Sequence, residues 1–408
     1  MRIALFGGSF DPFHYGHIEL IRGALDSGSA DVVIVIPTVS NNFKRGRVLI
    51  PAPYRYYMTK AAVEAEFKKN VFVSDIEFGL DGISYSVNTI KEITKGSVII
   101  PFLMKNGVPG EVAAERHQFF WLCGSDILPT FDKWYKASEI LSYVVLLVAA
   151  RKGDDTDIRE QGARLKGLFG CDLAVFEMKG VDQSSSDVKS KGDYKSLPQT
   201  VQDFIATHDI YNTIRALDYC SDDACVKFYD YAVRLYPLLS SKRLLHTLNV
   251  GLLSAKLAHD HGADADKALI AGTLHDCAKE IDIEEQRRMA EEVCGSLFEH
   301  EKLLHSPAGA YMAKKDFGVE DQEILDAITY HTTGRPDMTL LDKIVYLADK
   351  IEPARTYTDL TEMRRLAPID IDASIMLCLE SVMDKFRRKG RDIHPITLAW
   401  EKQLKSML

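Results

Sequence analysis

The sequence predicts two domains, an α/β domain of the doubly wound kind followed by an all-α domain. The chain has 408 residues, more than a single domain ordinarily holds. In its first half, short apolar segments alternate with helical ones, whereas after about residue 230 apolar residues recur at helical spacing. We expect the domains to span residues 1–213 and 222–408.

The strand-like segments of the first half are rich in β-branched and aromatic residues and are apolar throughout. Strands that are buried on both faces of a parallel sheet have this composition. The segments are Ile3–Phe6, Val32–Ile36, Val71–Val73, Phe119–Cys123, Val144–Ala149 and Leu173–Phe176. Helical segments such as Ile18–Leu25 and Tyr56–Phe67 separate them. This alternation predicts a parallel sheet covered by helices.

The second half contains apolar stripes with helical periodicity and few strand-like segments. Leu245, Leu248 and Leu252 form one stripe, and Ile324 and Ile328 form another. Residues three and four apart share one face of a helix, so these stripes predict helices packed on a common core. The junction between the halves is expected in the polar, aperiodic stretch 212–225.

Composition excludes several classes of protein. Lys and Arg total 50 against 59 Asp and Glu, giving a net charge of -9, which disfavours sequence-independent nucleic-acid binding. The seven cysteines include no CxxC pair, so we expect a reduced, cytoplasmic protein. Since no signal peptide or run of 18 apolar residues is present, we expect no contact with a membrane.

A glycine-containing loop follows the first predicted strand and leads into a helix with two histidines, His14 and His17. Glycines let the backbone approach a phosphate closely, and a helix N-terminus offers N–H groups and a positive dipole end. Because the two histidines are three residues apart, they share one face of the first helical turn. Their ring N–H groups could then contact phosphate oxygens during nucleotidyl transfer.

This segment resembles the signature of the HxGH nucleotidylyltransferase superfamily, and residues 1–213 resemble bacterial nicotinate-nucleotide adenylyltransferases. The resemblance implies transfer of AMP from ATP to nicotinate mononucleotide, giving deamido-NAD and pyrophosphate, with Mg²⁺ on the triphosphate. It implies that His14 and His17 are catalytic. The residues implied to bind ATP are Gly7, Gly8, Ser9, Phe10, His14, His17, Ser184, Ser185, Ser186 and Lys189.

The stretch Ser184–Lys189 stands where the family carries an SSTxxR motif, but it has Ser186 for Thr and Lys189 for Arg. Lysine keeps the positive charge and loses the two-pronged hydrogen bonding of arginine. The resemblance also implies a set of residues that bind the mononucleotide. They are Lys44, Ser84, Tyr85, Asp126 and Trp134.

Two questions stay open for this domain. Trp134 could stack on the pyridine ring or could serve only as a core anchor. The acceptor could also be nicotinamide mononucleotide or phosphopantetheine, because the choice between carboxylate and amide depends on a few groups around Ser84 and Tyr85. No function is predicted for the long stretch 94–118.

The second half carries a set of residues typical of a metal site. They are His246, the adjacent His275 and Asp276, His305, His331 and Asp349. Several lie among apolar residues at helical spacing, and a buried carboxylate needs a partner, which a divalent metal supplies. Nitrogen and oxygen ligands without sulfur suit Fe, Mn, Zn or Co. Any one histidine could be a hydrogen-bonded core residue, but six such residues in one helical domain favour a metal site.

The order of these residues resembles the HD phosphohydrolase superfamily, and segments 274–279, 330–336 and 346–355 resemble its YqeK-type branch. That branch is associated with symmetrical hydrolysis of diadenosine tetraphosphate to two ADP. The resemblance implies one or two metal ions, iron foremost, bridged by a catalytic Asp276 that also ligates metal. One ion would use His246, His275 and Asp349, and the other His305 and His331.

In such a site a metal-bound hydroxide attacks phosphorus. The resemblance implies that Lys279, Arg335 and Arg355 contact the substrate phosphates. Two alternatives stay open for this domain: it could act on another nucleotide phosphoester, or it could be a nucleotide-binding sensor. The predicted partners of the chain are the small molecules ATP, nicotinate mononucleotide and diadenosine tetraphosphate, and formation of a homo-oligomer is left open.

Overall fold

The computed structural model describes residues 1–39, 49–151, 158–178, 185–356 and 359–407. The chain divides into two compact units, Met1–Phe204 and Ile205–Leu408. Each has its own core of buried apolar side chains. The bounds 1–213 and 222–408 stay predictions of where each catalytic domain ends.

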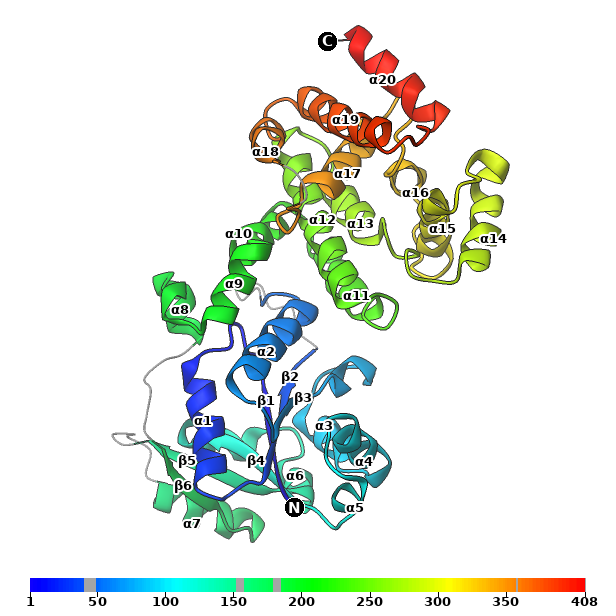
Figure 1. Cartoon of the computed structure of the whole chain (residues 1–408). Coiled ribbons are helices and arrows are strands. Elements are labelled where there is room, and N and C mark those ends of the chain that lie inside the picture. The colour runs from blue at the N-terminus through cyan, green and yellow to red at the C-terminus, as the bar shows by residue number, and fades with distance from the viewer. Residues whose placement is uncertain (40–48, 152–157, 179–184, 357–358, 408) are drawn as a thin grey trace. The chain divides into compact units, whose positions relative to one another are not determined.

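The first unit is built on a six-stranded sheet in which every strand pair is parallel (Figure 1). The strand order is β3-β2-β1-β4-β5-β6. This confirms the predicted doubly wound α/β fold. The strands are β1 (Arg2–Gly8), β2 (Val32–Pro37), β3 (Val71–Val73), β4 (Gln118–Gly124), β5 (Val145–Arg151) and β6 (Ala174–Met178).

Helices of the first unit cover both faces of this sheet (Figure 1). α1 packs on β2, β4, β5 and β6, and α2 packs on β2 and β3. The other face, with Ile3, Leu5 and Ile34, shares a core with buried residues of α3–α7. These helices are α1 (Tyr15–Asp26), α2 (Ala52–Glu66), α3 (Ser86–Ile93), α4 (Gly96–Lys105), α5 (Gly110–Ala113), α6 (Ala137–Tyr143), α7 (Ile158–Phe169) and α8 (Ser185–Lys191).

The long stretch 94–118 has a structural role. It forms α4 and α5, and Ile99, Leu103 and Ala113 belong to the core on that face of the sheet.

The strand order predicts where on the sheet a ligand crevice lies. β1 lies between β2 and β4, so the connections that leave β1 and β4 run in opposite directions along the sheet. In open α/β sheets, ligands bind at the carboxyl ends of strands where the order reverses. β1 ends at Gly8 and β4 ends at Gly124, so the glycine loop and the segment after Gly124 border this crevice.

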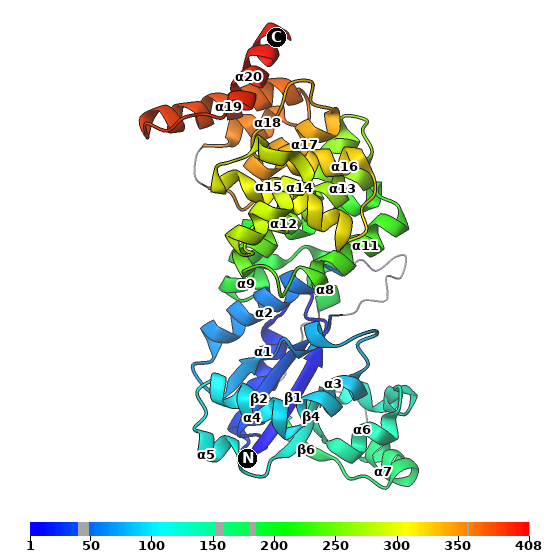
Figure 2. The same ribbon diagram turned by 90° about the vertical axis from the view of Figure 1, so that its right-hand side faces the viewer.

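The second unit is helical throughout its described residues, which confirms the predicted all-α class (Figures 1 and 2). α9 (Gln199–His208) begins before the division at Ile205 and ends after it. The next helices are α10 (Ile210–Thr213), α11 (Asp222–Arg234), α12 (Ser241–Asp260), α13 (Ala265–Leu274) and α14 (Ile283–Cys294). The last are α15 (Glu301–Lys315), α16 (Gln322–Tyr330), α17 (Leu340–Ile351), α18 (Thr361–Leu366), α19 (Ile371–Arg388) and α20 (Pro395–Met407).

Two glycines let α12 and α13 pack unusually closely. A Cβ at Gly272 would stand 2.9 Å from the Cα of Gly251, and a Cβ at Gly251 would strike the hydroxyl of Thr273. Helix axes separated by small residues approach more closely than those separated by large side chains. This contact brings His246 of α12 beside His275, which directly follows α13.

Within the described residues, no helix is both long and apolar enough to cross a membrane. All seven cysteines lie in the described parts of the chain, and none is paired in a disulfide.

Candidate active sites

The glycine loop of the first unit packs tightly against the sheet. A Cβ at Gly7 would strike the ring of Trp121 on β4, and a Cβ at Gly8 would stand 2.9 Å from the ring of Phe10. Phe10 itself has a positive φ of 47°, a backbone conformation that is uncommon for a residue with a side chain. The two glycines are therefore needed for packing as well as for close approach to a ligand.

The two histidines of the loop are held against each other. The His14 N–H donates to His17 Nδ1 at 3.1 Å, and the rings stack with centroids 3.7 Å apart. Because Nδ1 of His17 accepts a hydrogen bond, the proton of the neutral ring lies on Nε2. This nitrogen is a donor at the N-terminus of α1, where the helix dipole favours an anion.

Helix α8 is attached to the same loop. Ser185 Oγ donates to Pro12 O at 3.0 Å, and Lys189 Nζ lies 2.8 Å from Oδ2 of the buried Asp11. The buried Arg55, which belongs to α2, donates to Ser9 O, and this hydrogen bond is 2.7 Å long. The structure thus brings two predicted ATP-binding residues from α8 to the histidine loop.

Two predicted residues, Lys44 and Ser184, lie outside the described residues. Ser186 lies within α8.

Four of the predicted mononucleotide-binding residues are described: Ser84 and Tyr85 lie in the connection from β3 to α3, and Asp126 and Trp134 lie in the segment that follows β4. Tyr85 directly precedes α3, and its ring lies 4.3 Å from that of Tyr135. Asp126 is exposed just after β4, and Ser84 is partly buried. Trp134 packs against Trp121 at 6.2 Å between ring centroids and stays partly exposed. Trp134 is therefore joined to the core and can still offer a face to a ligand.

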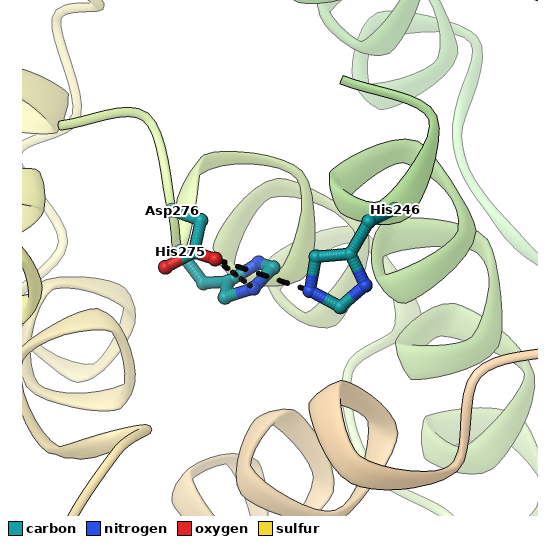
Figure 3. Close-up of side chains that lie close together, drawn as sticks. All are labelled: His246, His275 and Asp276. Carbon is teal, nitrogen blue, oxygen red and sulfur yellow. Dashed lines mark ion pairs between the residues drawn. The ribbon is translucent and has the colours of Figure 1, made fainter. Parts of the chain in front are cut away.

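The second unit gathers all six predicted metal ligands around Asp276. They come from five places in the fold: His246 from α12, His275 and Asp276 from the end of α13, His305 from α15, His331 from the end of α16, and Asp349 from α17. All six are buried. Figure 3 shows the Asp276 carboxylate facing the rings of His246 and His275.

The two oxygens of Asp276 face two different groups of ligands. Oδ2 lies 3.6 Å from His275 Nε2 and 3.9 Å from His246 Nε2. Oδ1 lies 3.3 Å from His305 Nε2 and 3.4 Å from His331 Nε2. Each group of three could hold one metal ion. Asp276 belongs to both, so it has the geometry of a carboxylate that bridges two ions.

Asp349 lies beside the first group. Its Oδ1 is 3.0 Å from His246 Nε2 and 3.8 Å from His275 Nε2.

Three of the imidazoles are oriented for metal binding. When Nδ1 of a neutral histidine donates to an acceptor, Nε2 carries the lone pair that a metal needs. In each case Nδ1 faces an acceptor and Nε2 faces the cluster. The acceptors are Gly272 O at 2.7 Å from His275, Ile328 O at 2.7 Å from His331 and Glu352 Oε1 at 3.1 Å from His246.

The protonation states of His275, His305 and Asp276 suit a cation. Burial lowers the pKa of His275 to about 3 and holds the pKa of His305 well below its usual value. Burial raises the pKa of Asp276, but the neighbouring histidines and Lys279 outweigh this and hold it well below its usual value. Neutral imidazoles beside an ionised carboxylate are the ligand states that divalent metals bind.

Two buried atoms of the cluster, His275 Nε2 and Asp276 Oδ1, have no hydrogen-bond partner. A buried polar atom without a hydrogen-bond partner destabilises the fold, and a bound cation would give both atoms a partner. The residues present therefore fit a divalent metal.

The predicted phosphate-binding cations differ in their surroundings. Arg355 Nη2 lies 2.7 Å from Asp349 Oδ1, and Lys279 Nζ lies 2.7 Å from His305 Nε2, so both border the cluster. Arg335 is paired with the buried Asp342 at 3.0 Å and lies over the ring of Tyr330.

Arg243 is a functional candidate that the sequence-based reasoning missed. Its Nη1 lies 2.6 Å from Asp276 Oδ2. Its position one helical turn before His246 was the signal that could have revealed it.

A cavity of about 450 Å³ opens beside His246. Three cationic side chains, Lys242, Arg243 and Arg355, line it together with Thr207 and His208 of α9. Clustered cations next to a metal site suit a polyphosphate.

Two family models match the chain. Residues 5–218 match the cytidylyltransferase-like family, and residues 243–354 match the HD domain family.

Curated relatives resemble the whole chain or one of its halves. A protein of Mycoplasma pneumoniae named probable nicotinate-nucleotide adenylyltransferase/Ap4A hydrolase is 28% identical over 388 residues, covering 93% of this chain and 98% of that protein. A symmetrical bis(5'-nucleosyl)-tetraphosphatase of Halalkalibacterium halodurans is 40% identical over 171 residues, covering 41% of this chain and 91% of the relative.

A probable nicotinate-nucleotide adenylyltransferase of Aliarcobacter butzleri is 30% identical over 212 residues, covering 51% of this chain and 97% of the relative. The sheet with its histidine loop and the helical unit with its Asp276 cluster agree with these matches. The chain therefore belongs to the cytidylyltransferase-like family in its first half and to the HD family in its second.

Proposed function

We propose that this protein is a bifunctional enzyme, a nicotinate-nucleotide adenylyltransferase and a symmetrical diadenosine tetraphosphate hydrolase. One observation carries the proposal: a relative named for both activities aligns with 93% of this chain. The placement of the candidate residues supports it. The histidine loop lies at the carboxyl end of β1, and the six-residue cluster lies in the helical unit.

In the first reaction, a phosphate oxygen of nicotinate mononucleotide attacks the α-phosphorus of ATP. A new phosphoanhydride bond forms, and the bond between the α- and β-phosphates breaks to release pyrophosphate. Donors positioned before the reaction stabilise the charge that develops on the phosphates. The proposed donors are His14 and His17 with Lys189, and Mg²⁺ bound to ATP would neutralise further phosphate charge.

The acceptor is proposed to bind near Ser84, Tyr85 and Trp134. An assay with ATP and each of nicotinate mononucleotide, nicotinamide mononucleotide and phosphopantetheine tests this choice. Preference for nicotinate mononucleotide supports the proposal, and preference for either other acceptor contradicts it.

In the second reaction, diadenosine tetraphosphate is cleaved at its central anhydride bond to give two ADP. Two divalent ions, which we propose to be iron, would be held by the groups that share Asp276, with Asp349 beside the first group. When bound, they would activate water and hold the phosphate oxygens. Arg243, Lys279 and Arg355 are proposed to bind the substrate phosphates. Arg335, which is paired with Asp342, is proposed to contact these phosphates as well.

The test uses the full-length protein purified with its metal retained and supplied with diadenosine tetraphosphate. Formation of ADP alone, abolished by a chelator and restored by added metal, supports the hydrolase. Formation of ATP and AMP would contradict the symmetrical cleavage. Absence of turnover despite bound metal would overturn the hydrolase proposal in favour of another phosphoester substrate or a sensor.

A further inference from the structure

A chain of buried hydrogen bonds extends from the metal ligand His246 to α9. Nδ1 of His246 (Figure 3) lies 3.1 Å from Glu352 Oε1. Asn249 Nδ2 donates to Glu352 Oε2 at 2.8 Å and also lies 3.0 Å from His208 Nδ1. Asn249 is fully buried, Glu352 is 2% exposed and His208 is 9% exposed. These groups form one connected polar network that is largely buried.

The donors in this network can be assigned. The amide nitrogen of Asn249 has two hydrogens. One goes to Glu352 and the other points at His208 Nδ1, which must therefore accept. A neutral His208 with its proton on Nε2 is the state that fits. Burial lowers the pKa of His208, which agrees with a neutral ring.

The network fixes the orientation of His246. The backbone N–H of Ala354 also donates to Glu352 Oε2, at 2.7 Å, so the carboxylate is held by Ala354 and Asn249. Held in this way, Glu352 keeps the proton of His246 on Nδ1 and turns Nε2 toward Asp276 and Asp349. Partners of this kind orient metal ligands, and their loss typically weakens metal binding about 10–100-fold.

His208 lies outside the segment that matches the HD domain family, residues 243–354, and inside the segment 5–218 that matches the other family. It nevertheless belongs to the second compact unit, which begins at Ile205. Together with Thr207 it lines the cavity that contains Arg243, His246 and Arg355. The last turn of α9 is therefore part of the wall of the second active site.

We infer that His208 is a positioning residue of the hydrolase site, which acts through Asn249 and Glu352 to hold the metal ligand His246. The inference rests on the proposed hydrolase function for its catalytic consequence, but not for its effect on metal binding. It also means that a fragment that begins at residue 222 lacks a part of this site.

The test compares full-length His208→Ala, His208→Asn and His259→Ala with the unchanged protein. Asparagine places an acceptor oxygen near the position of His Nδ1, so it should restore the bond to Asn249. His259 is an exposed histidine of α12 that stacks on Tyr219, so it is a matched control. The apparent Kd for Mn²⁺ is measured by titration of metal-free protein, and kcat and KM are measured with diadenosine tetraphosphate.

His208→Ala should weaken Mn²⁺ binding about 10-fold. This is the low end of the loss expected when a group that orients a metal ligand is removed, because Asn249 and Glu352 stay in place. We expect kcat to fall more than KM rises, whereas His208→Asn and His259→Ala should stay within about twofold of the unchanged protein. Adenylyl transfer by the same preparations reports that the first unit is folded.

Unchanged Mn²⁺ affinity in His208→Ala would overturn the inference. Equal losses of Mn²⁺ affinity in His208→Ala and His208→Asn would overturn it too, because they would show that the hydrogen-bond acceptor at this position does not matter. Failure of the proposed function looks different. In that case the unchanged protein binds Mn²⁺ and releases no ADP, while the order of Mn²⁺ affinities among the variants still tests His208.

Discussion

Asp276 occupies the centre of the helical site because its two oxygens face different pairs of histidines. No other residue of the cluster belongs to both groups that could hold a metal. We predict that Asp276→Ala loses bound metal and diadenosine tetraphosphate hydrolysis and retains adenylyl transfer. Elemental analysis of the purified variant, together with both assays, checks this. Turnover retained without metal would contradict the metal assignment.

His17 is held at the start of α1 by its bond to the His14 N–H. Its proposed role is to donate to phosphate oxygens as charge develops, and loss of one such donor typically costs about 10²–10³ in kcat. His17→Ala should therefore lose adenylyl transfer by about this factor and spare hydrolysis. His117→Ala, in the same unit but outside the loop, is the control. An equal loss of both activities in His17→Ala would show that the two sites are not independent.

At the scale of elements, the contact between α12 and α13 determines whether the two metal-ligand segments meet. A Cβ at Gly272 would stand 2.9 Å from both the Gly251 Cα and the Val250 backbone oxygen. These are backbone atoms, which cannot yield as a flexible side chain can. The helices must then separate, and they carry His246 and His275 with them.

We predict that Gly272→Ala destabilises the protein by about 1–3 kcal/mol, the usual cost of overpacking a core, and weakens metal binding. Gly167→Ala in α7 is the matched control, because nothing lies within 4 Å of a Cβ there and alanine favours a helix. Urea unfolding and Mn²⁺ titration measure the two effects. Metal affinity unchanged in Gly272→Ala would mean that the helix spacing does not determine the site.

At the level of the complete chain, the two compact units have separate cores, and among the described residues only the helical unit has a cluster of possible metal ligands. A ligand that binds only the folded state stabilises it by RT ln(1 + [L]/Kd), about 2.7 kcal/mol at 100 Kd. We predict that a chelator lowers the Tm of the helical unit by several degrees. Adenylyl transfer should stay unchanged as long as the assay keeps Mg²⁺ in excess of the chelator. Calorimetry of the full chain with and without metal checks this, and an unshifted Tm would contradict a structural contribution of the metal.

The class of each unit and the six metal-ligand candidates could be predicted from the residues alone. All six predicted strand segments overlap observed strands. The central strands were recognisable because parallel strands buried on both faces are apolar throughout, as in Val32–Ile36. The ligands were recognisable because polar residues such as Asp349 recur among apolar ones at helical spacing, and burial of a carboxylate demands a partner.

How these residues could act together depends on the packing of the helices and strands. The roles proposed for Arg243, Glu352 and His208 depend on contacts between helices, as between His246 and Glu352, which are 106 positions apart. The same holds for Gly7, whose missing side chain makes room for Trp121 on another strand. Local spacing indicates which face of a helix a residue occupies, but it carries no information about what packs against that face. That depends on how the helices and strands assemble.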